Sequence, residues 1–369
     1  MSRVFVRGWG AVSPAGWGMA NLRDALARAE PLPTRDLPRP GRARPLKVRG
    51  VPTPATRPAF VAHARLRRTS PIAQYAVAAS LEALGPGALP LSSGSSQLGI
   101  IFCVMAGCVN YSRRFYDEVL KDPALASPLV FPETVFNAPA SHLASLLGTK
   151  AVNYTLVGDP GTYLQGVALA AEWLGQKRVD GCLVVGAEEL DWLVSEAFGF
   201  FDRTGVVSDG AGALYLRREP SGETAVELSE ITSPQLFTRA QTRAQAAVRA
   251  QLELNGVHPN GLLCDGLQGS VRLDRDEASA WHSWTGPRLS PKAICGEAFT
   301  AAAAWQCTVA VDSIAHENIP SATVSVVGCN QQAIAARFVK SDSSPKAGNL
   351  RARSAGEVSK ARLVARGAP

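Results

Sequence analysis

The sequence predicts an α/β protein with a largely parallel central sheet, because the same pattern occurs twice along a chain of suitable composition. Residues 151–157 have a strand pattern, a helix with regularly spaced apolar positions follows, and residues 182–185 form a second buried strand. The order strand, helix, strand returns at 261–264, 299–314 and 323–327. Such units pair their strands in parallel through a crossover. With 369 residues, 46% of them hydrophobic, the chain can bury a large core as two halves or as one large unit.

The N-terminal segment predicts a strand at 4–6 that ends in a glycine turn at 8–10, followed by a short helix through Leu26. Residues 31–58 are rich in Pro and Arg, which disfavours both helix and central strand. We therefore expect an exposed loop there, with one edge strand at 46–48.

A helix is predicted from Ser70 to about Leu84, because Ser is a favoured N-cap and Pro71 suits the first helical position. Residues 98–104 predict a buried strand, and residues 140–147 a short helix.

The remaining elements are a strand at 210–216, a polar turn at 219–224 and a long helix at 238–255. Beyond residue 340 the composition turns to Ser, Lys, Arg, Ala and Gly with little periodicity, which is typical of disorder. These boundaries divide the chain into an N-terminal half, a C-terminal half and a disordered basic tail, at 1–217, 218–340 and 341–369.

Charge and cysteine usage exclude several classes of protein. The net charge of +7 favours an acidic partner, but no basic stripe interleaved with aromatic residues predicts nucleic-acid binding. No apolar run approaches the roughly 20 residues of a membrane span, and the N-terminus is interrupted too early for a signal peptide. We expect a cytoplasmic protein whose seven cysteines, without metal-ligand spacing, are reduced and buried, and which uses no metal or cofactor.

The turn before the helix that starts near Thr162 reads Gly-Asp-Pro-Gly, and its surroundings resemble the β-ketoacyl synthase family of the thiolase-like superfamily. The resemblance implies a thiolase-like fold, in which two similar βαβ halves form an α-β-α-β-α layered core. The motifs that carry it are G-x-V-S-P-x-G at 10–16, Val-Asn-Tyr at 152–154, Gly-Ala-Glu-Glu at 186–189 and Asp-Gly-Ala-Gly-Ala at 209–213.

In this family a catalytic Cys stands at the strand-to-helix turn, where the helix N-terminus favours its thiolate. A gap-free comparison places Pro160 at that position, whereas a comparison based on the small residues of the helix places Gly158 there. Neither residue is a nucleophile. Asp159 and Pro160 together are typical of a helix start, and the alternative is that Asp159 acts as a nucleophile or base.

The resemblance also implies two catalytic His residues and a Lys. Asp265 stands where the first His of an H-G-T-x-T motif belongs. In the second motif, K-x-x-x-G-H, Lys292 is retained and Glu297 replaces the His. An ionised carboxylate cannot donate a hydrogen bond to a developing oxyanion. For Lys292 we expect an ion pair with Asp276 or Glu277 that holds two segments together.

Two further departures affect the pocket that the resemblance implies. The glycine-rich closing motif F-G-F-G-G-x-N reads Val-Val-Gly-Cys-Asn-Gln-Gln at 326–332, without the Phe gate and most of the glycines. The stretch between 186–188 and 201–203 is shorter than in active members, so a pocket-lining loop is absent or cut back.

Together these departures predict a catalytically inactive subunit similar to the chain-length factors of type II polyketide, fatty acid or aryl polyene biosynthesis. The expected partners are an active ketosynthase or a second copy of this chain, and an acidic acyl carrier protein that docks on the pair. The Arg-rich residues 35–57 are expected to be a solvated loop, and binding of the carrier protein there is the alternative. Two alternatives stay open. One is a thiolase-fold acyltransferase or hydrolase with a rebuilt acidic site of Asp159, Asp265 and Glu297. The other is a homodimer that binds an acyl chain without catalysis.

Overall fold

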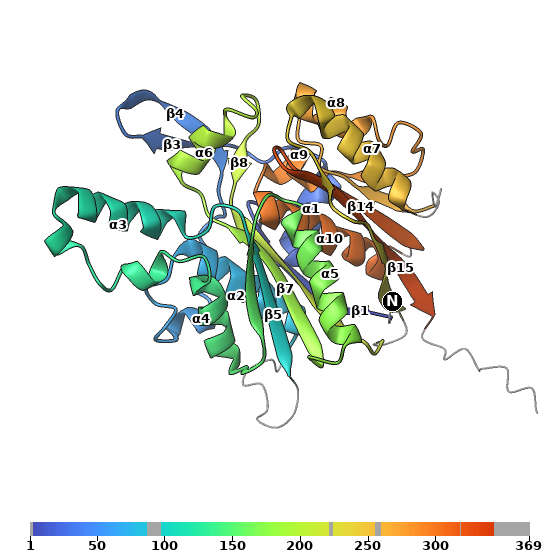
Figure 1. Ribbon diagram of the computed structural model, residues 1–369, viewed down its shortest axis with the longest axis horizontal. Helices are drawn as coiled ribbons and strands as arrows, with labels where there is room; N and C mark the ends of the chain where they lie inside the picture. Colours follow the sequence, from blue (N-terminus) through green and yellow to red (C-terminus); the bar gives the residue numbers. More distant parts are fainter. Residues whose placement is uncertain (1–2, 87–96, 221–223, 255–259, 318, 343–369) are drawn as a thin grey trace, which may run out of the picture.

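The computed structural model describes residues 3–86, 97–220, 224–254, 260–317 and 319–342 (Figure 1). Within them, twelve strands hydrogen-bond into one sheet. Ten lie side by side in the order β13 (Arg288–Leu289), β12 (Leu262–Cys264), β14 (Ser321–Val327), β15 (Gln332–Asp342), β10 (Thr224–Ile231), β1 (Phe5–Ser13), β9 (Gly210–Arg217), β7 (Gly181–Glu188), β5 (Leu98–Val104) and β6 (Asn153–Val157). The short strands β2 (Gly16–Trp17) and β11 (Gln235–Leu236) pair with β1 and β15.

The sheet folds over at the short pairing of β1 with β10, so that its two halves enclose a layer of helices. This layer contains α5 (Thr162–Gly175), which contacts β5, β7 and β15, and α10 (Phe299–His316), which contacts β7, β9, β12 and β14. The outer faces are covered by α2 (Pro71–Leu84) and α4 (Ala138–Leu147) on one side and by α7 (Arg243–Glu253) on the other (Figure 1). The predicted α-β-α-β-α core is therefore confirmed.

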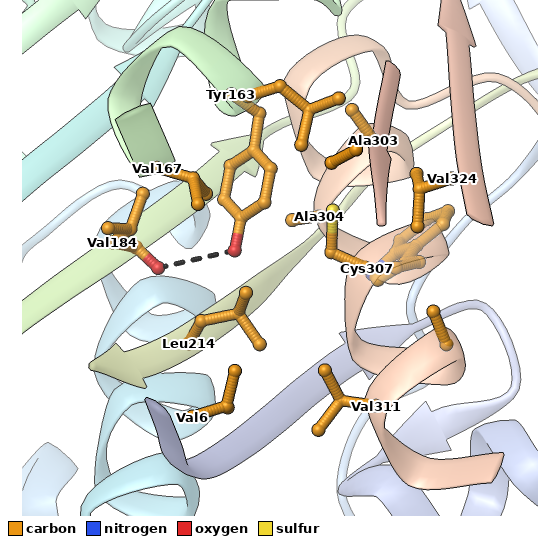
Figure 2. Packing of buried hydrophobic residues seen from close by; sticks show 14 of the residues in the cluster. Val6, Tyr163, Val167, Val184, Leu214, Ala303, Ala304, Cys307, Val311 and Val324 are labelled. Carbon is orange, nitrogen blue, oxygen red and sulfur yellow. Dashed lines mark hydrogen bonds between the residues drawn. The ribbon is translucent and has the colours of Figure 1, made fainter. Parts of the chain in front are cut away.

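The middle layer explains the composition of α10. A helix that is apolar on every side belongs in an interior, and all but the last two residues of α10 are buried. Figure 2 shows Cys307 and Val311 of α10 in the same cluster as Tyr163 of α5 and Leu214 of β9. Small residues on α10 let both halves of the sheet approach its backbone.

The predicted crossovers are present with one correction. β12 pairs directly with β14 in parallel, as the pattern predicts. β6 and β7 also run in parallel, but β5 lies between them and pairs with both. A strand that the sequence pattern does not predict, β15, follows β14 and pairs with it antiparallel over the whole length of β14.

The first strand is longer than its glycines predict, because they lie within β1 instead of ending it. A Cβ atom on Gly8 would lie 2.0 Å from the carbonyl oxygen of Ala83, and one on Gly10 would lie 2.3 Å from that of Ala79. The two glycines therefore allow α2 to pack directly against the strand.

Residues 35–49 form a hairpin of β3 (Arg35–Arg39) and β4 (Arg42–Arg49), not the exposed loop expected from their Pro and Arg content. The ladder accommodates Pro38 because its register shifts between Leu37 and Arg39. The hairpin is held to the body of the protein by Val48, which pairs with β8 (Val207–Ser208) and is fully buried. The expected edge strand at 46–48 lies within β4.

Helix boundaries differ from the predictions at two places. Ser70 precedes α2 but does not cap it, because its hydroxyl donates to the carboxylate of Glu189, which also accepts from the Ile72 N–H. The long helix expected from residue 238 begins only at Arg243, after a 3₁₀ turn at Ala240–Thr242.

Further helices complete the fold: α1 (Met19–Arg28), α3 (Val109–Lys121), α6 (Trp192–Phe198), α8 (Val271–Ala278) and α9 (Pro291–Cys295), with 3₁₀ turns at Ala59–Ala62, Pro123–Leu125 and Phe131–Glu133. None of the helices in the described ranges is both long and apolar enough to span a bilayer. The predicted disordered tail lies outside the described residues from 343 onward, as do residues 221–223 of the predicted turn and residue 255. The division into halves at residue 217 stays a prediction.

Candidate functional site

The turn expected to carry a nucleophile joins β6 to α5 at the end of the N-terminal half of the sheet. Gly158 donates its N–H to the carbonyl of Val104 on the neighbouring strand, at 3.0 Å, and Pro160 is buried. The helix itself begins at Thr162, whose N–H donates to the carbonyl of Asp159 at 2.9 Å. Pro160 is therefore in the turn before the helix, not at the first helical position that the sequence predicts.

Asp159 connects the two halves of the protein. Its carboxylate accepts the Gly161 N–H at 3.2 Å, and it also accepts the backbone N–H and the side-chain amide of Gln332, at 3.1 and 2.9 Å. Gln332 begins β15, so the carboxylate links the turn before α5 to the C-terminal half. Burial raises the pKa of Asp159, and these hydrogen bonds oppose the shift. Asp159 is therefore not the helix N-cap that the sequence predicts, because Gly161 occupies that position without a side-chain cap. Its carboxylate instead links the two halves.

Lys292, the retained Lys, forms a buried ion pair with Glu297, which stands at the position of the second His. The Lys292 Nζ lies 2.7 Å from Glu297 Oε2, and the other carboxylate oxygen accepts the Phe299 N–H at 2.7 Å. Burial disfavours the charge of Lys292, but Glu297 and Glu277 outweigh it and raise the pKa of the ammonium group. The expected partner of Lys292 is therefore wrong, because the ion pair is made with Glu297 and not with Asp276 or Glu277.

The backbone explains why Lys292 and Glu297 meet. Lys292 is on the single turn of α9, and Gly296 follows in the left-handed region with φ of +92°. A Cβ atom there would lie 2.6 Å from the carbonyl oxygen of Val206, so the turn requires glycine. The chain reverses at Gly296 and returns Glu297 to Lys292.

Asp265 lies directly after β12 and is 1% exposed. One oxygen receives a hydrogen bond from the Ser290 hydroxyl, and the other lies 3.6 Å from the Arg288 guanidinium. That second oxygen accepts no hydrogen bond from the described residues. Burial raises the pKa of Asp265, whereas the Ser290 hydroxyl and the Arg288 charge lower it.

The charges of Asp265 and Lys292 act on Glu277 of α8 in opposite directions. Burial and the charge of Asp265 raise its pKa, and Lys292 opposes them. The carboxylate accepts the Gly266 N–H and the Ser325 hydroxyl, both at 2.9 Å. It therefore connects the loop after β12 to β14. Asp276 instead faces Arg243, with 3.7 Å between the charged groups.

Cys329, in the turn between β14 and β15, is half-buried, unlike the other six cysteines. The charges of Glu297 and Asp159 act on it, but burial is the main cause that raises its pKa to about 12. The charges of Lys292 and Arg243 oppose this shift but do not outweigh it, so the thiol is protonated at neutral pH and lacks the thiolate character of a reactive cysteine. All seven cysteines are free thiols, and the other six are buried, as the sequence predicts.

Sequence reasoning missed the residue that fixes this turn, Arg243. It is 3% exposed and donates to the carbonyls of Gly328, Leu273 and Val327 at 2.8, 2.7 and 3.0 Å. Its helix has an Ala, Gln and Arg composition that is typical of a solvent-facing surface, so no local signal separates Arg243 from its exposed neighbours. The role of Gln332 had no signal either, because its partner is 173 residues away.

The charges of Asp159, Lys292 and Glu297 thus all act on Cys329, and those of Asp265 and Lys292 act on Glu277. Comparison with known sequences then assigns the family. The model of the β-ketoacyl synthase N-terminal domain matches residues 1–220. The chain belongs to the β-ketoacyl synthase family. No curated protein matches its sequence.

Solved structures of this family have the same fold. The ishigamide ketosynthase/chain length factor has a TM-score of 0.76 at 18% identity, over 92% of this chain and 99% of that one. A β-ketoacyl synthase from Burkholderia phymatum STM815 has a TM-score of 0.74 at 17% identity, over 92% and 100%. A type II polyketide ketosynthase in complex with its acyl-carrier protein gives 0.71 at 16%, over 92% and 99%. The predicted thiolase-like fold is confirmed.

Proposed function

We propose that this β-ketoacyl synthase family member does not catalyse condensation alone and pairs with an active ketosynthase, in the manner of a chain length factor. The observation that carries the proposal is the turn before α5, where Gly158 and Pro160 occupy the two candidate positions of the catalytic Cys. Condensation in the family requires a thiolate at this turn. Asp159, the remaining candidate, already uses its carboxylate to hold Gln332.

The two positions of the catalytic His residues support the same conclusion. Glu297 is committed to Lys292 and to the Phe299 N–H, and Asp265 to Ser290 and Arg288. An oxyanion hole needs donors aimed at the developing charge, and an ionised carboxylate would repel that charge.

The edge strand β6 supports pairing with another subunit. It hydrogen-bonds only to β5 among the described strands, and its side chains Tyr154 and Val157 are 48% and 53% exposed. An edge with apolar side chains and unpaired backbone groups is a template for another strand. The resemblance implies that family dimers join their sheets at this edge, next to the turn at 158–161.

The segment from α3 to α4 supports a large interface beside that edge. α3 has no buried residue, and the turns after it leave Leu125 and Leu129 78% and 76% exposed. Phe131 and Phe136 are also exposed, at 55% and 45%. Figure 1 shows α3 extending away from the body of the protein on the side of α4. Apolar surface of this extent is typical of a protein contact. We infer that the ketosynthase partner covers it.

An acyl carrier protein is the second proposed partner. Exposed Arg42 and Arg44, at the tip of the hairpin, have no ion-pair partner within the described part of the chain. Such a surface attracts an acidic protein through long-range electrostatics. The acyl-carrier protein named in one similar structure supports this choice. A cytoplasmic location stays a prediction.

The test is a condensation assay with a malonyl carrier thioester and an acyl primer. The chain is assayed alone, with a ketosynthase encoded beside it, and with that ketosynthase after its catalytic Cys is replaced by Ala. We expect product only from the pair with the intact ketosynthase. Product formed by the chain alone, or by the pair with the Cys→Ala partner, would overturn the proposal.

The rebuilt acidic site stays a second candidate, because Glu277 and Asp265 have raised pKa values and influence each other. A carboxyl group with a pKa near neutrality can exchange a proton during turnover. If this chain hydrolyses or transfers acyl groups through that site, Asp265→Asn and Glu297→Gln each abolish turnover of an acyl thioester. Turnover that persists in both variants, or that is absent from the unmodified chain, removes this candidate.

The third hypothesis, a homodimer that binds an acyl chain, is distinguished from the paired subunit by its oligomeric state. If the homodimer is the functional form, sedimentation gives this chain at twice its own mass both alone and with the ketosynthase, and the two proteins sediment separately. A mixed species of one copy each supports the paired subunit.

A further inference from the structure

A cavity of about 280 Å³ lies between α1, α10 and the strands β12 and β13, apart from the Lys292 and Glu297 pair. Its apolar wall includes the buried side chains of Met19, Leu26, Leu262 and Val309. Its volume corresponds to roughly nine water molecules, at about 30 Å³ each. A cavity of this size and lining suits a short apolar ligand.

The polar groups of the cavity determine which end group such a ligand carries. Arg23 is already satisfied, because its guanidinium donates two hydrogen bonds of 2.7 Å to the carboxylate of Asp312. Arg288 is less well compensated. Its guanidinium donates to the Trp281 carbonyl, but its nearest carboxylate oxygen, on Asp265, is 3.6 Å away. That distance is beyond hydrogen-bond length.

Two carboxylates line the cavity: Asp312, which is paired with Arg23, and Glu317, which is exposed to solvent. Water already screens the charge of Glu317, so a cationic ligand would gain little from pairing with it. The Arg288 side chain is only 30% exposed, and a charge in such a setting gains more from a close counterion. A planar carboxylate also matches the guanidinium fork.

We propose that this cavity binds a small monocarboxylate with a short apolar chain. The carboxylate pairs with Arg288, and the chain packs against Met19, Leu26 and Val309. The inference is independent of the proposed function, since it concerns binding at a second site.

Ligand binding at Arg288 also affects Asp265, because Arg288 lines the cavity and its guanidinium is near the Asp265 carboxylate. The bound carboxylate and Asp265 compete for one guanidinium. Occupancy of the cavity therefore reduces the compensation of the Asp265 charge, and removal of that charge strengthens ligand binding.

The test is calorimetric titration of the full chain with hexanoate, hexanol and hexylamine. We expect hexanoate to bind most tightly and hexylamine most weakly. Arg288→Gln should weaken hexanoate binding at least tenfold and leave hexanol nearly unchanged. The matched control is Arg249→Gln, which removes an exposed arginine of α7 that does not line the cavity. Asp265→Asn should tighten hexanoate binding several-fold.

A further variant keeps the test decisive if Arg288→Gln fails to fold. Ala27 is an exposed residue of α1 that lines the cavity, and Ala27→Trp should block hexanoate and hexanol alike without a change in charge. The proposal is overturned if hexanoate does not bind, if hexylamine binds more tightly than hexanoate, or if hexanoate binds Ala27→Trp as well as the unmodified chain.

Discussion

The buried polar cluster around α9 and the exposed rim formed by α3 and β6 differ in where their charged groups, backbone groups and apolar side chains find partners. In the cluster, the charge of Lys292 is matched by Glu297 at 2.7 Å, and Glu297 has a further donor in the Phe299 N–H. On the rim, Tyr154 and Val157 project from a strand that has one neighbour among the described strands. The buried ion pair finds its partners within the chain, whereas the edge strand leaves one side unpaired by the described residues.

The difference supports the proposal that this protein does not act as an independent catalyst. A catalytic site keeps groups free to act on substrate, whereas the cluster uses its charged groups to hold segments of the chain together. Unpaired backbone and apolar surface are instead concentrated at the edge, where they are costly unless another molecule covers them.

The largest expected effect comes from breaking the interior pair. Lys292→Met leaves Glu297 charged and buried without its cation, which should lower the free energy of unfolding by about 3–5 kcal/mol. Urea denaturation measures the loss. The double variant Lys292→Met with Glu297→Gln is the matched control and should recover most of the stability. A single variant as stable as the unmodified chain would contradict the idea of a self-sufficient interior.

The next effect concerns association. Val157→Arg places a charge on the exposed edge strand and should weaken binding to the ketosynthase partner by about 100-fold, as measured by titration of the two subunits. The free energy of unfolding of the isolated chain should not change, because the side chain is already half in solvent. Leu252→Arg, on the exposed face of α7, is the control and should leave binding intact. Equal binding by both variants would exclude β6 from the interface.

A pH effect follows from Glu188, whose burial raises its pKa to about 7 from an ordinary value of 4.5. The folded state therefore holds the proton of Glu188 more tightly than the unfolded state. Protonation of Glu188 adds to the free energy of unfolding; this contribution is complete below pH 4.5 and is lost as the pH rises through 7. Between pH 8 and pH 5.5 the contribution should amount to about 2 kcal/mol.

Glu188→Gln removes the titratable carboxyl group. In denaturant titrations, the increase in the free energy of unfolding between pH 8 and pH 5.5 should then be about 2 kcal/mol smaller than in the unmodified chain. Glu219→Gln, a change at an exposed carboxylate, should leave the pH dependence as it is in the unmodified chain. The same slope in all three proteins would show that Glu188 does not titrate in this range.

The smallest effect expected is at Thr300, whose hydroxyl contacts the carbonyl of Cys103 at 3.0 Å and the carboxylate of Glu188 at 2.8 Å. Thr300→Val keeps the shape and removes this link between α10 and β5, at a cost of about 1–2 kcal/mol measured by thermal unfolding. Thr242→Val, where the hydroxyl donates to a local carbonyl on the exposed surface, should cost less than half as much. A larger loss at Thr242 would contradict the assignment.

The sequence predicts the fold because local pattern and global arrangement agree along much of the chain. Residues 98–104 form β5 at the expected boundaries, and the small residues of α10 suit a helix enclosed on both sides. The hairpin at 35–49 was not predictable from propensity, because burial of Val48 against a distant strand outweighs its Pro and Arg content.

The candidate site could be located from the sequence, but its bonds could not be assigned. Motif positions identified Asp265, Lys292 and Glu297, yet the partner of Lys292 depends on the reversal at Gly296. The link from Asp159 to Gln332 depends on how two turns meet in space, and no spacing in the sequence encodes that distance.

That link fixes the shape of the turn at 158–161 from a distant part of the chain. A Cβ atom on Gly328 would lie 1.9 Å from the carboxylate of Asp159, so residues on opposite halves have become fitted to each other. A cysteine introduced at residue 158 or 160 would meet a turn shaped by this fit, with Asp265 and Glu297 at the positions where the resemblance implies imidazoles. A single substitution at the turn would therefore not rebuild a ketosynthase site.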